Sequence, residues 1–491
     1  MPATTSATLS RANLLRSHAY LDGQWCAAAS GRTFDVTNPV NAALITQVPD
    51  MDGADTRRAI TAAHRAQPAW AALTAKARGN LLARWFELIT AHSDDLAYIM
   101  TCEQGKPLAE AKGEVAYGAS FIQWFSEESK RAYGRTIPGF SGDRRLATIK
   151  QPVGVVAAIT PWNFPIAMIT RKAGPALAAG CTIVIKPAAE TPLCALALAV
   201  LAEEAGIPAG VINVVPSRQA AAVGDELCSN SMVRKLSFTG STRIGKQLMR
   251  QCADTMKRIS LELGGNAPFI VFDDADLDAA VVGALASKYR NAGQTCVCAN
   301  RILVQASVYD SFVEKLTAAV AALKVGDGLN DGVQIGPLIN PAAIHKVAQL
   351  VEQAQAAGAK VLLGGAAHPA GPLFYQPTLL AEVAADNPIL QQEIFGPVAP
   401  VVRFTTEAEA IALANDTPYG LAAYFYGRDI ARVWRVAEQL EYGMVGINEG
   451  IISTELAPFG GIKESGLGRE GAAEGLEEYL ETKYLCFGSI R

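Results

Sequence analysis

The sequence has no run of lysine and arginine residues, and its formal net charge at pH 7 is −4 over 491 residues. Proteins that bind nucleic acid usually carry a basic patch or stripe that pairs with the phosphates. Half of the residues are hydrophobic and 18% are charged, which is typical of an ordinary soluble globular protein. We therefore expect no nucleic acid partner.

Long hydrophobic runs are also missing. The longest, such as Leu193–Ala202, stop at acidic residues well short of the length that crosses a membrane. Residues 1–20 contain no acid and carry Arg11 and Arg16, but they have no apolar core of signal-peptide length. The sequence thus predicts no membrane association and a loose N-terminal arm, with a transit peptide as the alternative interpretation of that arm.

Histidine is scarce, and none of the five histidines lies in a motif-like setting. The chain lacks the Cys/His spacing that ligates zinc, so we expect no metal site. The nine cysteines are an odd number and do not have the spacing of a disulfide framework. Unpaired thiols indicate a reducing compartment, which we take to be the cytoplasm.

Alternating helical and strand patterns predict an α/β fold of about three domains. Residues 52–133 have helical apolar spacing and are rich in Ala, Leu and Glu. Beyond them, short apolar runs alternate with helical stretches, a pattern typical of buried parallel strands in a doubly wound sheet. These runs lie at 154–160, 182–186, 211–215 and 235–238.

A second α/β domain is predicted from Asn266 to about Ile447, with strands at 269–272, 302–304 and 398–404. Two further strand signals flank these domains. Residues 20–25 predict a first strand with a turn at Asp22-Gly23. The tail 479–487 is expected to pair either with a strand at 144–150 or with another subunit.

Two glycine motifs compete for the role of phosphate loop. Gly466-x-Gly468-x-x-Gly471 matches the dinucleotide fingerprint, but no strand leads into it and too few residues follow for a βαβ unit. We interpret it as a flexible glycine turn. The stretch 238–246 follows a strand and opens a helix, so its N–H groups suit a phosphate, although Gly-Ser-Thr there also fits a simple helix cap. Lys186 ends another strand, where open α/β sheets bind ligands.

Cys296 lies in a polar segment and is separated from Cys298 by one residue. Such a pair alone is more often two surface or core thiols. The other parts of a nucleophilic cysteine site have candidates, however. Glu262 stands among apolar residues at a strand end, where burial would raise its pKa and suit a general base, although a structural carboxylate fits equally. Asn163, in a turn between two prolines, offers an amide to an oxyanion.

Together these motifs resemble the aldehyde dehydrogenase superfamily, and the resemblance runs from Tyr20 to the C-terminus. It implies Cys296 as the nucleophile, Glu262 as the general base, and Asn163 with the Cys296 N–H as the oxyanion hole. The matching stretches stand in the family's order and approximate spacing, at 161–165, 186–192, 238–245, 262–266, 293–296 and 393–397.

The resemblance also implies a nicotinamide dinucleotide cofactor, with Lys186 and Glu393 on its ribose groups. Ala189 stands where NAD-preferring relatives often carry Glu and NADP-preferring ones often carry Ser. Since alanine neither repels a 2′-phosphate nor binds a diol, we favour NADP and keep NAD as the alternative. The implied cofactor-binding residues are Ile159, Thr160, Pro161, Trp162, Lys186, Ala189, Glu190, Phe238, Gly240, Ser241, Gly245, Leu263, Gly264, Glu393 and Phe395.

The implied fold is an aldehyde dehydrogenase-like α/β architecture. It has a Rossmann-type cofactor domain at residues 1–132 and 152–265 and an α/β catalytic domain at 266–464. A small β-ribbon used in oligomerisation, at 133–151 and 478–491, completes it. A homodimer or homotetramer is expected.

Within the superfamily the sequence is most similar to succinate-semialdehyde dehydrogenases, on the stretches 168–172, 289–298 and 447–453. This likeness implies that Arg171, Arg290 and Ser453 hold the substrate's far carboxylate, unless one arginine pairs with an internal acid or with the cofactor phosphate instead. Glutarate semialdehyde remains an alternative, because a pocket discriminates one methylene by only about 1–3 kcal/mol. A catalytically retired structural relative is a remote alternative.

Cys298 suggests a redox switch, because a disulfide with Cys296 would consume the nucleophile reversibly. The ring would be small and strained, and a passive neighbouring thiol is the alternative.

Overall fold

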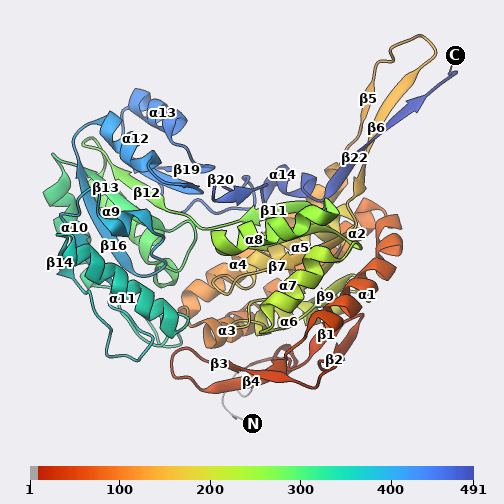
Figure 1. Cartoon of the computed structure of the whole chain (residues 1–491), viewed down its shortest axis with the longest axis horizontal. Coiled ribbons are helices and arrows are strands. Elements are labelled where there is room, and N and C mark those ends of the chain that lie inside the picture. The colour runs from red at the N-terminus through yellow and green to blue at the C-terminus, as the bar shows by residue number, and fades with distance from the viewer. Residues whose placement is uncertain (1–8, 491) are drawn as a thin grey trace.

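The computed structural model describes residues 9–490. Its first half, joined by the late strand β21, builds an eight-stranded sheet in the order β2-β1-β9-β8-β7-β10-β11-β21 (Figure 1). The five strands from β9 to β11 run parallel, whereas β1, β2 and β21 run antiparallel to their neighbours. The strands are β1 (Ala19–Leu21), β2 (Gln24–Cys26), β7 (Val155–Ile159), β8 (Thr182–Lys186), β9 (Ile212–Val214), β10 (Val233–Thr239), β11 (Arg258–Glu262) and β21 (Gly466–Leu467).

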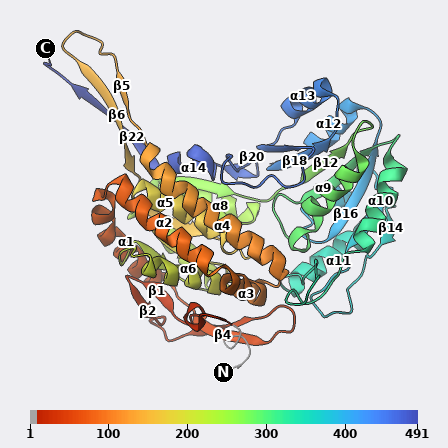
Figure 2. The ribbon, with the colours of Figure 1, turned by 180° about the vertical axis from the view of Figure 1, so that it is seen from behind.

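Helices cover both faces of this sheet, so its central strands β7 and β8 are buried and mostly apolar. Successive residues of a strand point to opposite faces; accordingly, Val156 and Ala158 pack with α2 to α6, and Val155 and Ala157 pack with α1, α7 and α8. Figures 1 and 2 show these two layers from opposite sides. The helices are α1 (Gly53–Ala72), α2 (Ala75–Ala91), α3 (Ser93–Gln104), α4 (Leu108–Glu128), α5 (Ala167–Ala179), α6 (Leu193–Glu204), α7 (Ala220–Ser229) and α8 (Thr242–Cys252).

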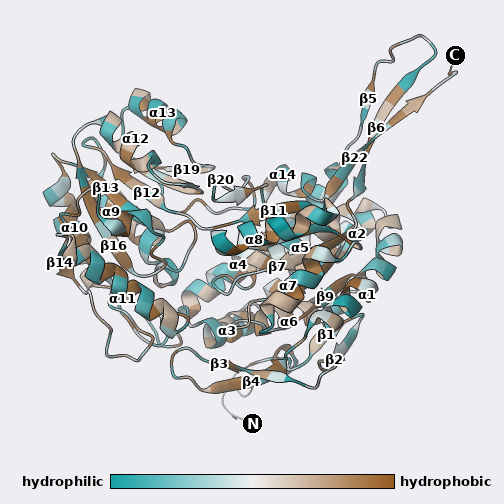
Figure 3. Ribbon diagram, in the orientation of Figure 1, coloured by the Kyte–Doolittle hydropathy of each residue, from teal (hydrophilic) through white to brown (hydrophobic). Residues whose placement is uncertain are grey.

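The second half builds a seven-stranded sheet, in the order β14-β15-β16-β13-β12-β18-β19. Its strands are parallel except β14, and both sheets stand out as brown, hydrophobic layers in Figure 3. The strands are β12 (Ala267–Val271), β13 (Ala299–Gln305), β14 (Lys360–Leu363), β15 (Thr378–Ala381), β16 (Val398–Phe404), β18 (Ala422–Tyr426) and β19 (Met444–Ile447). The helices are α9 (Leu277–Tyr289), α10 (Tyr309–Ala321), α11 (Pro341–Ala356), α12 (Glu407–Asn415) and α13 (Ile430–Gln439).

Smaller elements complete the chain. A three-stranded ribbon of β5 (Arg135–Ile137), β6 (Arg145–Pro152) and β22 (Leu480–Phe487) projects from the body with the C-terminus (Figures 1 and 2). A separate hairpin pairs β3 (Thr33–Thr37) with β4 (Leu44–Pro49), and β17 (Tyr419–Gly420) pairs with β20 (Ile462–Lys463). The remaining helix is α14 (Ala472–Glu477), and 3₁₀ turns lie at Ala12–Leu14, Ser129–Arg131, Ala253–Thr255, Arg290–Gly293 and Pro388–Gln391.

The doubly wound α/β fold and the strands predicted in both halves are confirmed. The tail pairs with β6 over its whole length, which settles its partner within the chain. Of residues 9–490, no helix combines the length and the apolar character needed to span a membrane.

Two predictions were wrong in detail. The expected loose N-terminal arm is packed from Leu9 onward: Leu14 is fully buried, and Asp95 accepts hydrogen bonds from Ser10 and Arg11. Residues 1–8 lie outside the described part of the chain. The motif at Gly466 is not a flexible turn, because Gly466 and Leu467 extend the first sheet beside Glu262. A short strand with little side-chain pattern is not recognisable in sequence.

Candidate active site

Cys296 follows a stretch of left-handed backbone. After α9 ends, Asn291, Ala292 and Gly293 take φ values of 51°, 54° and 74°. This region is costly for alanine, tolerated by asparagine and free for glycine. A Cβ on Gly293 would also lie 2.1 Å from the Gly396 carbonyl oxygen. The left-handed conformation at 291–293 therefore depends on contacts with neighbouring residues that stabilise it.

Two cavities meet at Cys296. One, of about 260 Å³, is also lined by Arg171, Arg290 and Ser453, and we name it the aldehyde pocket. The other, of about 270 Å³, contains Asn163. It shares the 161–162 and 239–241 segments with a larger cavity of about 1050 Å³ beside the first sheet. We name the cavity that contains Asn163 and this larger cavity, taken together, the cofactor cavity. Cys296 thus stands between a small pocket and a long one.

The predicted cofactor residues gather along this cofactor cavity, with one exception. Gly245 lies inside α8 and lines neither part; a Cβ there would approach Leu263 to 2.4 Å, so it permits close packing of α8 on the segment after β11. The large part is lined by Ile159, Thr160, Pro161, Trp162, Lys186, Ala189, Glu190, Phe238, Gly240 and Ser241. The part next to Cys296 is lined by Leu263, Gly264, Glu393 and Phe395.

The cofactor cavity fits a dinucleotide. Its volume exceeds the roughly 300–1,000 Å³ of ordinary ligand pockets. The N-terminus of α8, capped by Ser241, borders it and offers backbone N–H groups to a pyrophosphate. Lys186 supplies an ammonium at the end of β8, and burial lowers its pKa.

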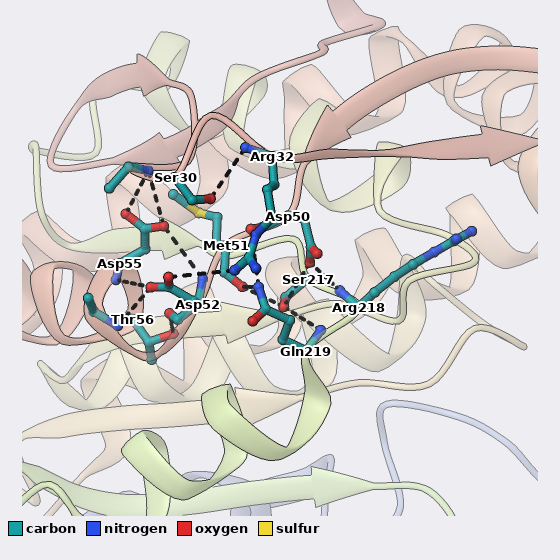
Figure 4. A network of polar contacts seen from close by, with 12 residues as sticks. Ser30, Arg32, Asp50, Met51, Asp52, Asp55, Thr56, Ser217, Arg218 and Gln219 are labelled. Carbon is teal, nitrogen blue, oxygen red and sulfur yellow. Dashed lines mark hydrogen bonds and ion pairs between the residues drawn. The ribbon is translucent and has the colours of Figure 1, made fainter.

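One side of this cavity was not predicted from the sequence. The tip of the β3–β4 hairpin lines it, as do Ser217 and Arg218 after β9. Asp50 accepts hydrogen bonds from the Arg218 N–H at 2.8 Å and the Ser217 hydroxyl at 3.4 Å, and Ser217 donates to the Met51 carbonyl oxygen at 2.6 Å (Figure 4). The Arg218 side chain extends away from this network, and its guanidinium carbon lies 5.2 Å from the centroid of the Phe34 ring. A polar loop of ordinary composition would not have suggested this role.

Each of the two predicted oxyanion donors has an N–H group that makes no hydrogen bond within the described residues. The Asn163 amide donates one hydrogen bond, of 3.0 Å, to the Gln294 carbonyl oxygen, which leaves its second N–H. Within residues 9–490 no group accepts a hydrogen bond from the Cys296 backbone N–H. Burial raises the pKa of the Cys296 thiol to about 12, an effect that Arg171 opposes. The resting thiol is therefore protonated at neutral pH.

Glu262 ends β11 and is buried. Burial, followed by the nearby charge of Glu470, raises its pKa well above the usual value, in the direction expected from the sequence. One of its oxygens has no hydrogen-bond partner in the described part of the chain. Glu262 lies near enough for its charge to raise the pKa of the Cys296 thiol as well. A carboxyl whose protonated form is favoured by burial thus lies near the thiol.

Arg290 is a cation of the aldehyde pocket that has no acidic partner in the described part of the chain. Its guanidinium lies 5.3 Å from the Phe164 ring centroid and has no carboxylate within ion-pair distance among residues 9–490. Ser453 lines the same pocket, as does the hydroxyl-bearing Tyr117, which interacts with Ser453. Glu110 also lines it, but accepts a hydrogen bond of 2.8 Å from the Asn291 N–H.

Sequence reasoning missed Tyr117 and Glu110. They share one face of α4, at helical spacing with Gly113 and Glu114. A polar stripe on a helix normally predicts a solvent-facing side, so only the structure reveals that this stripe faces a pocket.

Arg171 lines the aldehyde pocket but is already paired. Its guanidinium lies 2.7 Å from a Glu470 carboxylate oxygen and stacks on Phe459 at 3.8 Å. Lys172 contacts the other oxygen of Glu470 and donates to the Thr239 hydroxyl at 2.6 Å. This is the internal-acid alternative considered for one of the two arginines. Arg290 has no such acidic partner in the described part of the chain, whereas Arg171 has one and keeps two nitrogens, Nε and Nη2, without a hydrogen bond there.

Cys298 lines neither of the cavities that meet at Cys296. Its thiol contacts the Lys288 carbonyl oxygen at 2.9 Å, and burial raises its pKa. A disulfide with Cys296 would require the Cys298 side chain to leave this contact.

Comparison with known proteins agrees with this geometry. The family model described as "Aldehyde dehydrogenase family" matches residues 25–485. The chain is 64% identical to the succinate-semialdehyde dehydrogenase [NADP(+)] of Escherichia coli (strain K12), covering 98% of this chain and 99% of that protein. It is 64% identical to a glutarate-semialdehyde dehydrogenase of Pseudomonas aeruginosa, covering 98% and 100%.

A solved structure described as an E. coli NADP dependent enzyme superposes with a TM-score of 0.97 at 63% identity, covering 98% of this chain and all of that one. The family match covers all of the second sheet, most of the first and the two cavities at Cys296, and the solved structure shares the fold. The chain therefore belongs to the aldehyde dehydrogenase family.

Proposed function

We propose that the chain oxidises succinate semialdehyde to succinate, with NADP as the preferred cofactor. The unpaired Arg290 guanidinium, in the same pocket as Cys296, carries this proposal. A short aldehyde with a carboxylate at its far end needs a partner for that charge when it is buried. The planar donor fork of an arginine suits both carboxylate oxygens. The relative from E. coli supports the same substrate.

In the first step the Cys296 sulfur attacks the aldehyde carbonyl carbon, and the thiol proton passes to Glu262, which releases it to solvent before the second step. The carbonyl oxygen gains negative charge, which the Asn163 amide and the Cys296 N–H stabilise. One such donor is typically worth about 10²–10³ in rate. The nicotinamide cofactor, when bound in the cofactor cavity, supplies the hydride acceptor that this oxidation needs.

In the second step a water molecule hydrolyses the thioester on Cys296. Glu262 takes a proton from that water, and a base of this kind is typically worth about 10²–10⁴. Burial and the charge of Glu470 raise the pKa of Glu262 above that of an exposed glutamate, which strengthens it as a proton acceptor. Intact Cys296, Glu262 and Asn163 also argue against a retired structural relative.

Replacing Arg290 by alanine should lower kcat/KM for succinate semialdehyde about tenfold or more, because a charge-assisted hydrogen bond is worth about 1.5–3 kcal/mol. Uncharged butanal, with the same carbon count, should be affected far less. Steady-state NADPH absorbance with both aldehydes measures this. Arg435→Ala, which removes an exposed arginine paired with Glu407, is the control.

Equal losses with both aldehydes would show that Arg290 is structural, and the carboxylate assignment would then fail. Arg171→Ala should also lower kcat/KM for succinate semialdehyde by tenfold or more. It should impair butanal as well, because it leaves Glu470 with one fewer partner beside Glu262.

Substrate length and cofactor choice are tested together by a screen of C3 to C6 semialdehydes with NADP and NAD. We expect succinate semialdehyde with NADP to give the highest kcat/KM. Ala189 leaves room for a 2′-phosphate, and Lys186 and Arg218 supply positive charge in the same cavity. A higher value for glutarate semialdehyde, or for NAD, would correct the corresponding part of the proposal.

Assembly and domain division also belong to this proposal. We assign the cofactor domain to residues 1–132 and 152–265, the catalytic domain to 266–464, and the ribbon to 133–151 and 478–491. The ribbon's projection, its free edge at β22 and its exposed Ile137, Phe140 and Phe487 support a homodimer or homotetramer. The nine free cysteines support a cytoplasmic location.

Cys298 is proposed as a redox partner of Cys296. Peroxide would oxidise the two thiols to a disulfide, with water as the other product. We expect inactivation that dithiothreitol reverses in the wild type but not in Cys298→Ala, where Cys296 oxidises further. Unchanged reversibility in the variant would make Cys298 a passive neighbour.

A further inference from the structure

A buried ion pair lies next to the site without touching a reacting atom. Lys106, in the corner between α3 and α4, pairs with Glu114 of α4, and each side chain is only 1% exposed. The Lys106 ammonium also donates to the Asn163 carbonyl oxygen at 2.7 Å and lies 4.0 Å from the Phe164 ring centroid. Burying two charges is costly unless the surroundings use all their hydrogen-bonding capacity.

The same pair holds the turn that carries the oxyanion amide. While one Glu114 oxygen contacts Lys106, the other accepts hydrogen bonds from the N–H groups of Ile166 and Ala167, at 2.9 and 3.2 Å. These N–H groups begin α5. The Asn163 turn is thus held at its carbonyl by Lys106 and at its exit by Glu114.

The α3–α4 corner, which comprises Gln104, Lys106, Glu110 and Glu114, also holds the left-handed turn before Cys296. Gln104 donates to the Asn291 side-chain oxygen at 3.0 Å, and Glu110 accepts from the Asn291 N–H at 2.8 Å. Gln104 in turn accepts from the Lys106 N–H at 2.8 Å. Asn291 is the first of the left-handed residues that lead to Cys296, and such backbone persists only where its surroundings determine it.

The two turns are joined directly as well. The Asn291 amide donates to the Asn163 carbonyl oxygen at 3.0 Å, the same oxygen that Lys106 binds. One buried corner therefore sets the separation of two donors that come from distant parts of the sequence. Neither Gln104 nor Lys106 lines the aldehyde pocket.

We propose that Lys106 and Gln104 are positioning residues of the oxyanion hole, which act by fixing the Asn163 amide relative to the Cys296 N–H. The inference rests on the proposed oxyanion role of Asn163. It extends the working site to two residues that line neither the aldehyde pocket nor the cofactor cavity. Small displacements of a donor are known to weaken catalysis strongly, so the corner should affect the rate rather than binding.

The test uses two variants, each made in the wild type and in Asn163→Ala. Lys106→Met with Glu114→Gln removes both charges together, so that neither is left buried and unpaired. Gln104→Leu breaks the other half of the corner without removing a charge. The control is Lys112→Met with Asp94→Asn, which breaks an exposed ion pair between the same two helices. The readouts are the single-turnover rate of NADPH formation, the cofactor dissociation constant and the melting temperature.

In the wild-type background we expect each corner variant to slow NADPH formation about tenfold or more, and by no more than the 10²–10³ that one oxyanion donor supplies. Succinate semialdehyde and butanal should suffer equally, and cofactor affinity should stay within about twofold. In the Asn163→Ala background the same changes should slow the reaction less than about twofold, because residues that act through one group are not additive.

Equal fold losses in both backgrounds would overturn the positioning role and make the corner merely structural. A corner variant with wild-type rates would overturn it too. If Asn163→Ala itself left the rate unchanged, the proposed oxyanion role of Asn163 would fail, which is a distinct result. If the charge-pair variant does not fold, Gln104→Leu decides the question alone.

Discussion

Replacement of Cys296 by alanine is expected to abolish aldehyde oxidation, leaving at most a few per cent of wild-type turnover. Cys296 is the thiol at which the aldehyde pocket and the cofactor cavity meet. Without the sulfur there is no covalent intermediate to split the oxidation into two easier steps. Cofactor affinity should change little, since most of the cavity that would hold the dinucleotide is built by the other sheet.

Steady-state NADPH absorbance and a fluorescence titration of the cofactor measure the two effects. Cys298→Ala is the matched control, because it removes a thiol from the same loop that lines neither cavity. Substantial turnover by Cys296→Ala, well beyond a few per cent, would exclude this residue as the nucleophile.

For Glu262→Gln the expected result is a burst followed by a stall. Glutamine keeps the size of the side chain but cannot accept a proton, and a general base typically contributes about 10²–10⁴. Thioester hydrolysis depends on the base most, so the first turnover should still release NADPH while later ones nearly stop. Rapid mixing of enzyme, succinate semialdehyde and cofactor, followed by absorbance, shows both phases.

Glu226→Gln is a suitable control, since it changes another buried acid of the same half of the chain, one that pairs with Arg57. Normal steady-state turnover by Glu262→Gln would remove this residue from the role of base. Loss of the burst as well would place its main effect before the thioester forms.

Periodicity and motif order predicted most of the fold. Strands such as β8 and β16 are short apolar runs bounded by turn residues, and both match the sequence prediction at their ends. Elements with a weak sequence pattern were not predicted. The β3–β4 hairpin is a local pairing of two short strands, and the strand at Gly466 is held by β11, which no local window contains.

Prediction of the site from sequence has the same limit, because contacts between distant residues are not visible in it. Motifs located Cys296, Glu262 and Asn163, because the residue types and their neighbours indicate chemistry. The pairing of Arg171 with Glu470 joins residues almost three hundred positions apart, and only packing reveals it. Tyr117 and Arg218 line cavities for the same reason, although their sequence surroundings are ordinary.

The most direct test of the central claim locates the acyl group itself. Glu262→Gln is mixed with succinate semialdehyde and NADP, quenched in acid during the stall, digested and analysed by mass spectrometry. A succinyl group on the peptide that contains Cys296, absent when NADP is omitted and absent in Cys296→Ala, is the predicted result. NADPH formation with no acyl group on Cys296, or with the acyl group on another residue, would contradict it.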